Sequence, residues 1–134
     1  MGQYWQIYNE TKQEKLSPWK FDECAKLYEW PMDGPGGMQS ALVVLLLEGS
    51  SLGDGGGDFT FENAPPELFA RIGSWRGDKV SIVGDYSHLA QYGNGFSEEY
   101  TDISSDLFAL MQYEKGLKSG NEQPHLAPDM IFNV

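Results

Sequence analysis

Hydrophobic and polar positions divide the chain into short segments separated by turn-forming residues. Residues 4–8 (YWQIY) are aromatic and β-branched, and the polar run 9–12 separates them from a second short segment at 14–16. This pattern is typical of two strands joined by a tight turn. Apolar β-branched residues also dominate 79–84, which is the clearest strand in the second half of the chain. The sequence therefore predicts an N-terminal hairpin and one further strand.

Two helices are predicted in the first half of the chain. Ser17 followed by Pro18 is typical of an N-cap with proline at the first helical position, and it predicts a helix from about 18 to 29. The continuous apolar segment 38–47 has a length that favours a buried helix. An inner strand fits the same segment, because periodicity does not distinguish the two.

Another helix is predicted over 104–115, where Ser104 is expected to cap the start and Gly116 to stop the end. A shorter helix is expected after Asn63, with two prolines in its first turn and Gly73 at its end.

Together these elements predict an α+β fold, in which a small antiparallel sheet packs against about three helices. A length of 134 residues suits a single core, and 40% hydrophobic residues exclude a charge-driven disordered chain. We expect one domain over 1–117, followed by an extended C-terminal tail over 118–134.

Acidic residues exceed basic ones, and the formal net charge is −11. No Lys or Arg lies between Lys26 and Arg71 or between Lys79 and Lys115, whereas the first stretch carries seven acids and the second six. Such a surface repels phosphates, so direct nucleic-acid binding is not expected. The charge favours either simple solubility or the attraction of a basic partner protein.

Cysteine content and the start of the chain bear on location. Cys24 is the only cysteine, so no internal disulfide can form, and the first residues lack the basic and apolar regions of a secretory signal. The longest apolar run is far shorter than the roughly 20 residues that span a bilayer. We expect a cytoplasmic protein with no membrane segment.

No cofactor is predicted. The glycine-rich segment 53–58 lacks the Lys-Ser or Lys-Thr pair of a phosphate-binding loop. Asp54 and Asp58 flank its glycines and are weak candidates for Ca²⁺ ligands, but the EF-hand spacing is absent, so no metal site is expected.

Polar and aromatic residues gather around the predicted strand 79–84. Asp78 and Asp85 bracket it, with Trp75 and Tyr86 beside them, which suits a carbohydrate or another polar small molecule. The structural alternative is that the carboxylates form turns and ion pairs and that the tryptophan belongs to the core. Further candidate binding residues are the acids of the loop that follows: Glu98, Glu99 and Asp102.

Three segments carry a resemblance to a known family: MGQYWQIYNETKQEKLSPWKF, GDGGGDF and WRGDKVSIVGDY. They resemble a family of small uncharacterised bacterial and fungal proteins that begin with Met-Gly-x-Tyr-Trp and carry a Trp-x-Gly-Asp strand ending in Gly-Asp-Tyr. The resemblance spans most of 1–110, implies one domain and transfers no activity. Thr11 stands where the family has an aspartate in its first turn.

Two functions are compatible with these observations. The leading hypothesis is an acidic, non-enzymatic interaction protein of the inhibitor or immunity type, which covers a basic surface on a partner such as a nucleic-acid-handling enzyme. The alternative is a small ligand-binding or hydrolytic domain that uses the cluster around Trp75. No catalytic residue is assigned, and the sequence does not indicate an oligomeric state.

Overall fold

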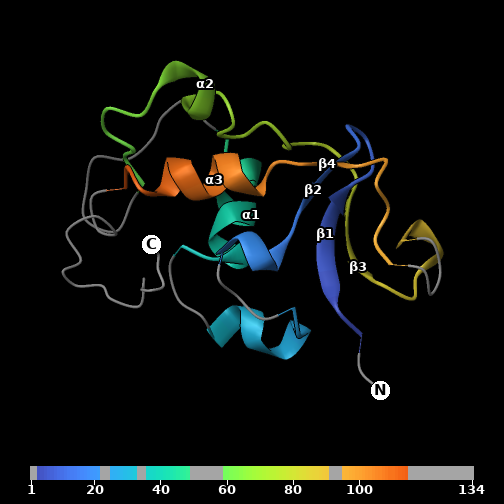
Figure 1. The fold of residues 1–134 in the computed structure, drawn as a ribbon. Helices are drawn as coiled ribbons and strands as arrows, with labels where there is room; N and C mark the ends of the chain where they lie inside the picture. The colour runs from blue at the N-terminus through green and yellow to red at the C-terminus, as the bar shows by residue number, and fades with distance from the viewer. Residues whose placement is uncertain (1–2, 22–24, 33–35, 49–58, 91–94, 115–134) are drawn as a thin grey trace.

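One mixed sheet and several short helices form the fold of the computed structural model, which describes residues 3–21, 25–32, 36–48, 59–90 and 95–114 (Figure 1). The elements in chain order are β1 (Trp5–Asn9), β2 (Glu14–Leu16), η1 (Pro18–Phe21), η2 (Leu27–Met32), α1 (Met38–Leu46), α2 (Pro66–Phe69), β3 (Val80–Gly84), η3 (His88–Ala90), β4 (Thr101–Asp102) and α3 (Ser104–Met111), where η denotes a 3₁₀ helix. The predicted α+β class is confirmed.

The strand order is β3-β1-β2-β4. β1 is antiparallel to both of its neighbours, with Ile7 opposite Leu16 on β2 and Ile82 on β3, so the predicted hairpin and third strand are confirmed. The prediction of a wholly antiparallel sheet was wrong, because β4 pairs parallel to β2. β4 is only two residues long, which is too short for an alternating pattern to be recognised in the sequence.

The hairpin turn is stabilised by its own side chains. Asn9 Oδ1 accepts a hydrogen bond from the Lys12 backbone N–H at 2.8 Å, and Gln13 adopts a positive φ of 57°. An Asn side chain that accepts a hydrogen bond from the backbone a few residues later favours a turn over continued strand. The register of β1 against β2 follows from this turn.

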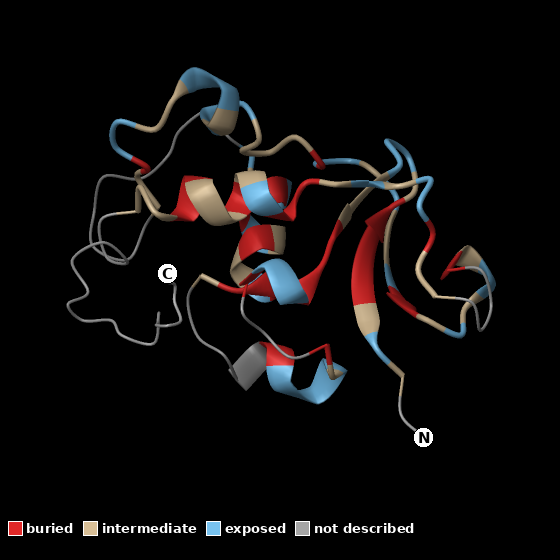
Figure 2. Ribbon diagram, viewed as in Figure 1, coloured by how far each residue is buried: buried red, intermediate tan, exposed pale blue. Residues whose placement is uncertain are grey.

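Different residues pack against the two faces of the sheet. Ile7 and Leu16 belong to the main core, to which α1 and α3 contribute buried side chains (Figures 1 and 2). Tyr8 and Val83 point to the opposite face, because side chains alternate along a strand. There they form a smaller cluster with Ala90 of η3 and the partly buried Phe96 and Tyr100. The segment that carries these two rings, residues 95–100, also contains Glu98 and Glu99 and is here called the acidic loop. It covers this face of the sheet.

The prediction of a continuous helix over 18–29 was wrong. The chain forms η1 and η2 instead, with 22–24 outside the described residues. In an α-helix the Ala25 carbonyl would accept a hydrogen bond from the Glu29 N–H. Here it accepts a hydrogen bond from the Trp5 N–H of β1 instead, at 3.0 Å. The Glu29 N–H donates to Lys26 O instead, at 3.1 Å, which is 3₁₀ geometry.

α1 confirms the helical alternative for the apolar segment 38–47. Its buried side chains, Met38, Ala41, Val44 and Leu45, follow helical spacing. None of the helices in the described ranges is long and apolar enough to cross a bilayer.

α3 begins where predicted, but its cap differs. Asp102 Oδ1 accepts a hydrogen bond from the Ser104 N–H at 2.9 Å, while Ser104 Oγ accepts one from the Ser17 N–H at 2.6 Å in a buried position. Ser104 therefore joins two distant segments instead of capping its own helix. α3 ends at Met111, four residues before the predicted end at 115. Beyond it, the Glu114 carboxylate accepts a hydrogen bond from the Thr60 N–H at 2.8 Å. The predicted tail 118–134 lies outside the described residues.

Candidate functional site

Asp78 and Asp85 lie at opposite ends of β3, on the order of 20 Å apart at the usual rise of a strand. Asp78 Oδ2 accepts hydrogen bonds from Asn9 Nδ2 at 2.8 Å and from Lys12 Nζ at 2.5 Å. Asp85 Oδ1 accepts one from the Tyr4 N–H at 3.3 Å. Each carboxylate therefore fastens one end of β3 to the hairpin, and the two do not converge on a ligand.

The hydrogen bond from Asn9, together with the hydrogen bond and positive charge of Lys12, lowers the pKa of Asp78 from its usual 3.8. A carboxyl whose pKa is lower in the folded state stabilises the fold above its unfolded pKa, and this contribution is lost as the pH falls through the folded value.

We expect the melting temperature of the wild type to fall more steeply than that of Asp78→Asn as the pH drops from about 5 to 2, because the amide has no proton to gain. Thermal melts across this range measure the difference. Parallel curves for the two proteins would contradict a depressed Asp78 pKa.

Trp75 lies in the core with 0% of its surface exposed. Its Nε1–H donates a hydrogen bond to Glu14 Oε1 at 2.7 Å. The other oxygen of this carboxylate, Glu14 Oε2, accepts a hydrogen bond from Arg71 Nη1 at 3.2 Å. Arg71 Nη2 in turn donates a hydrogen bond to Asp106 Oδ2 at 2.9 Å. Trp75 therefore offers no ring face to a ligand, although the sequence placed it in the candidate cluster. Tyr86 alone of that cluster's aromatic residues is exposed in the described structure.

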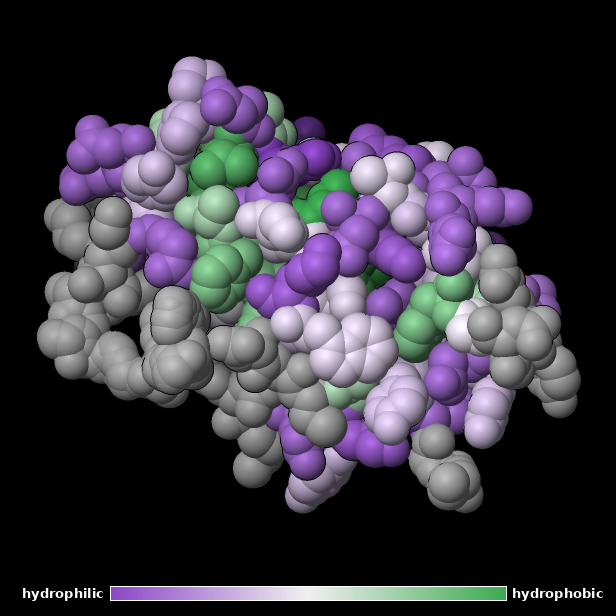
Figure 3. Space-filling model, in the orientation of Figure 1, coloured by the Kyte–Doolittle hydropathy of each residue, from purple (hydrophilic) through white to green (hydrophobic). Residues whose placement is uncertain are grey.

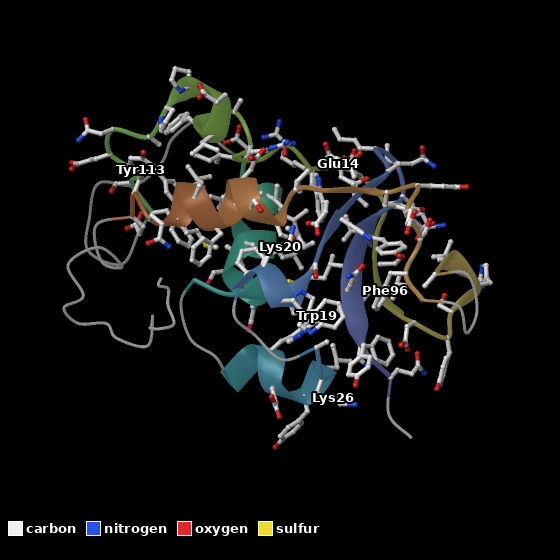
Figure 4. All side chains as sticks on the ribbon, in the orientation of Figure 1. Glu14, Trp19, Lys20, Lys26, Phe96 and Tyr113 are labelled. Carbon is white, nitrogen blue, oxygen red and sulfur yellow. The ribbon has the colours of Figure 1, made fainter. Side chains whose placement is uncertain are left out.

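Three other aromatic side chains form a surface cluster, here called the aromatic patch: Tyr4, Trp19 and Phe96. Trp19 contacts both of the others edge to face, with ring centroids 6.0 Å from Tyr4 and 6.2 Å from Phe96. Trp19 is 50% exposed and Tyr4 47%. In Figure 4 Trp19 and Phe96 lie beside each other, and Figure 3 shows side chains of intermediate hydropathy, drawn pale, near the centre of a face that carries both hydrophilic and hydrophobic groups.

Three lysines lie close to the aromatic patch, and each has a partner. Lys26 Nζ is 4.6 Å from the Tyr4 ring centroid, and Lys20 Nζ is 3.5 Å from Asp102 Oδ2. Lys15 Nζ donates to the Ser97 carbonyl at 3.1 Å. Burial lowers the pKa of Lys15, and nearby carboxylates oppose this effect.

Ser97 fastens the acidic loop to the sheet. Its N–H donates to Tyr8 Oη at 2.9 Å while its carbonyl accepts from Lys15, and Tyr8 itself stacks on Tyr100 at 4.3 Å between centroids. The exposed side chains of Glu98 and Glu99 follow directly after this anchor. Their backbone therefore has a fixed position beside the aromatic patch.

Of the predicted candidates, Glu98 and Asp102 both lie close enough to Lys15 for their charges to raise its pKa against the effect of burial. Sequence reasoning did not connect them with Trp19, Tyr4 or Phe96, since no local pattern relates segments so far apart in the chain.

No group of three or more His, Cys, Asp and Glu side chains that could hold a metal ion occurs within the described ranges. Asp54 and Asp58, the weak calcium candidates, lie outside those ranges.

The described residues define a small α+β protein with an aromatic patch bordered by lysines and carboxylates. No family model, curated protein or solved structure matches the chain. The resemblance drawn from the sequence motifs stays a prediction.

Proposed function

We propose that this protein is an acidic, non-enzymatic interaction protein of the inhibitor or immunity type, which binds a basic surface of a partner protein such as a nucleic-acid-handling enzyme. The observation that carries the proposal is the distribution of charge partners: the described cations are engaged within the molecule, whereas several exposed carboxylates are not. The proposal includes a cytoplasmic location, in keeping with the single cysteine.

Every described lysine and arginine contacts an internal partner. Five of them form ion pairs, Lys15 is bound to a carbonyl, and Lys26 lies over a ring. By contrast, four exposed glutamates have no Lys or Arg nitrogen within 4.0 Å among the described residues: Glu29, Glu67, Glu98 and Glu99. The outward-facing excess is therefore negative, which attracts a basic protein and repels phosphates.

The alternative, a ligand-binding or hydrolytic site for a small polar molecule, has less support. Its residue basis was the cluster of Trp75 with Asp78 and Asp85, and in the structure the tryptophan is buried and the two carboxylates lie at opposite ends of β3.

Affinity capture from the native host tests the proposal directly. We expect the captured partner to be basic, and its association rate to fall at least about tenfold as the salt concentration rises from roughly 0.05 to 0.5 M, because screening shortens the range of the acidic field. Stopped-flow mixing at several salt concentrations measures this, with thermal melts at each concentration as the control for folding. A partner whose association rate is independent of salt would contradict the proposal.

A further inference from the structure

The aromatic patch has the composition of a binding hot spot. Trp and Tyr carry much of the energy at protein interfaces, since they bury large areas at a low cost in side-chain entropy. Trp19 leaves half of its surface exposed, and its ring contacts those of Tyr4 and Phe96 edge to face. The indole is therefore both accessible and already ordered before any partner arrives.

The patch already accommodates a cation. The Lys26 ammonium lies 4.6 Å from the Tyr4 ring centroid, inside the distance of about 6 Å at which the ring quadrupole attracts positive charge. An indole attracts cations more strongly than a phenol ring does. Trp19 is therefore the better platform for a second cation.

Two carboxylates belong to segments that meet at the aromatic patch. Asp102 Oδ2 lies 3.5 Å from the Nζ atom of Lys20, the residue that follows Trp19 in the sequence. Glu98 follows Phe96 by two residues. The Lys20 to Asp102 pair is partly exposed, and pairs of this kind contribute little to stability. A guanidinium, which binds carboxylates with two parallel hydrogen bonds, can replace the lysine there.

An unpartnered acceptor also lies on this face of the sheet. Gln6 lies two residues before Tyr8 on β1, so their side chains share one face of the sheet, and Gln6 is 4% exposed. Its Oε1 is buried and has no hydrogen-bond partner among the residues that the structure describes. A buried acceptor without a donor lowers the stability of the fold. A partner's N–H group that reached this oxygen would supply the missing donor.

We infer that the aromatic patch receives an arginine side chain of the basic partner, with the guanidinium plane stacked on the Trp19 indole and its N–H groups directed toward Glu98 and Asp102. This inference rests on the proposed function and names the contact by which it acts. Arginine fits better than lysine because its flat, delocalised cation stacks and forms paired hydrogen bonds, whereas an ammonium is a compact and strongly hydrated charge.

Two charge-matched peptides test the inference: acetyl-(Gly-Arg)₄-amide and acetyl-(Gly-Lys)₄-amide, titrated into the full chain at low salt. We expect the arginine peptide to bind about fivefold more tightly and to shift the indole Nε1–H resonance of Trp19 in NMR spectra, which the Trp19→Leu variant assigns. Trp19→Leu should remove the preference for arginine. Its matched control, Tyr28→Leu, changes a more exposed aromatic residue and should retain the preference.

The carboxylate contact is tested in the same way. Glu98→Gln should weaken the binding of the arginine peptide several-fold, whereas Glu62→Gln, the same change in the segment before α2, should have little effect. Thermal melts confirm that each variant folds.

Equal affinity for both peptides, or an unchanged preference in Trp19→Leu, would overturn the arginine site and leave the acidic interaction function standing. Failure of the arginine peptide to bind would also overturn the site. In that case the capture experiment still decides the proposed function, because it does not depend on the peptides.

Discussion

Replacing Trp75 with alanine is expected to lower the free energy of unfolding by about 3–5 kcal/mol, the range typical of removing a large aromatic side chain from a core. Trp75 is fully buried among the residues of the main core, and its indole N–H is the hydrogen-bond donor to Glu14. The substitution creates a cavity and removes that donor. Urea denaturation followed by circular dichroism measures the loss.

Trp19→Ala is the matched control, because Trp19 is half exposed. Its expected cost is no more than about 1–2 kcal/mol, in proportion to the smaller apolar area that it buries. Similar losses in the two variants would contradict the assignment of Trp75 to the core.

Replacing Arg71 with methionine is expected to cost about 1–3 kcal/mol, the second largest effect. Arg71 bridges Glu14 and Asp106, so it connects β2 to α3 through a partly buried network. Methionine keeps much of the side-chain volume but leaves both carboxylates without their cation, and the loss of charged hydrogen bonds in a partly buried position accounts for the magnitude.

Arg76→Met provides the comparison for this network. Arg76 pairs with Glu48 at 3.4 Å on the surface, where both side chains are more than half exposed, and we expect a cost below about 0.5 kcal/mol. Denaturation of both variants under the same buffer conditions measures the difference. Equal effects at the two positions would show that the Arg71 network contributes no more than an ordinary surface pair.

Local signals in the sequence were sufficient for much of the fold. The hairpin, β3 and α1 were predicted from residue type and segment length, and the structure confirms them. The hairpin and α1 form their main hydrogen bonds between residues close in the sequence, and β3, although it pairs with the distant β1, is recognisable from its own β-branched residues.

The remaining features depend on contacts between distant residues. The Ala25 carbonyl is bonded to β1, which breaks the predicted helix, and Glu14, sixty-one positions from Trp75, accepts the indole N–H. Neither contact leaves a pattern in the sequence around it. The aromatic patch has the same origin, because Trp19 and Phe96 meet only after the loop has folded back over the sheet.

The strand order has a consequence for the chain while it is being synthesised. β1 and β2 emerge first and form the two central strands, but their outer partners, β3 and β4, come from 80–84 and 101–102. A nascent chain that ends before residue 80 has both hairpin edges open, with backbone groups free to pair with another chain. Translation must therefore pass most of the described sequence before these edges are closed, which makes arrested or truncated products the species most prone to aggregate.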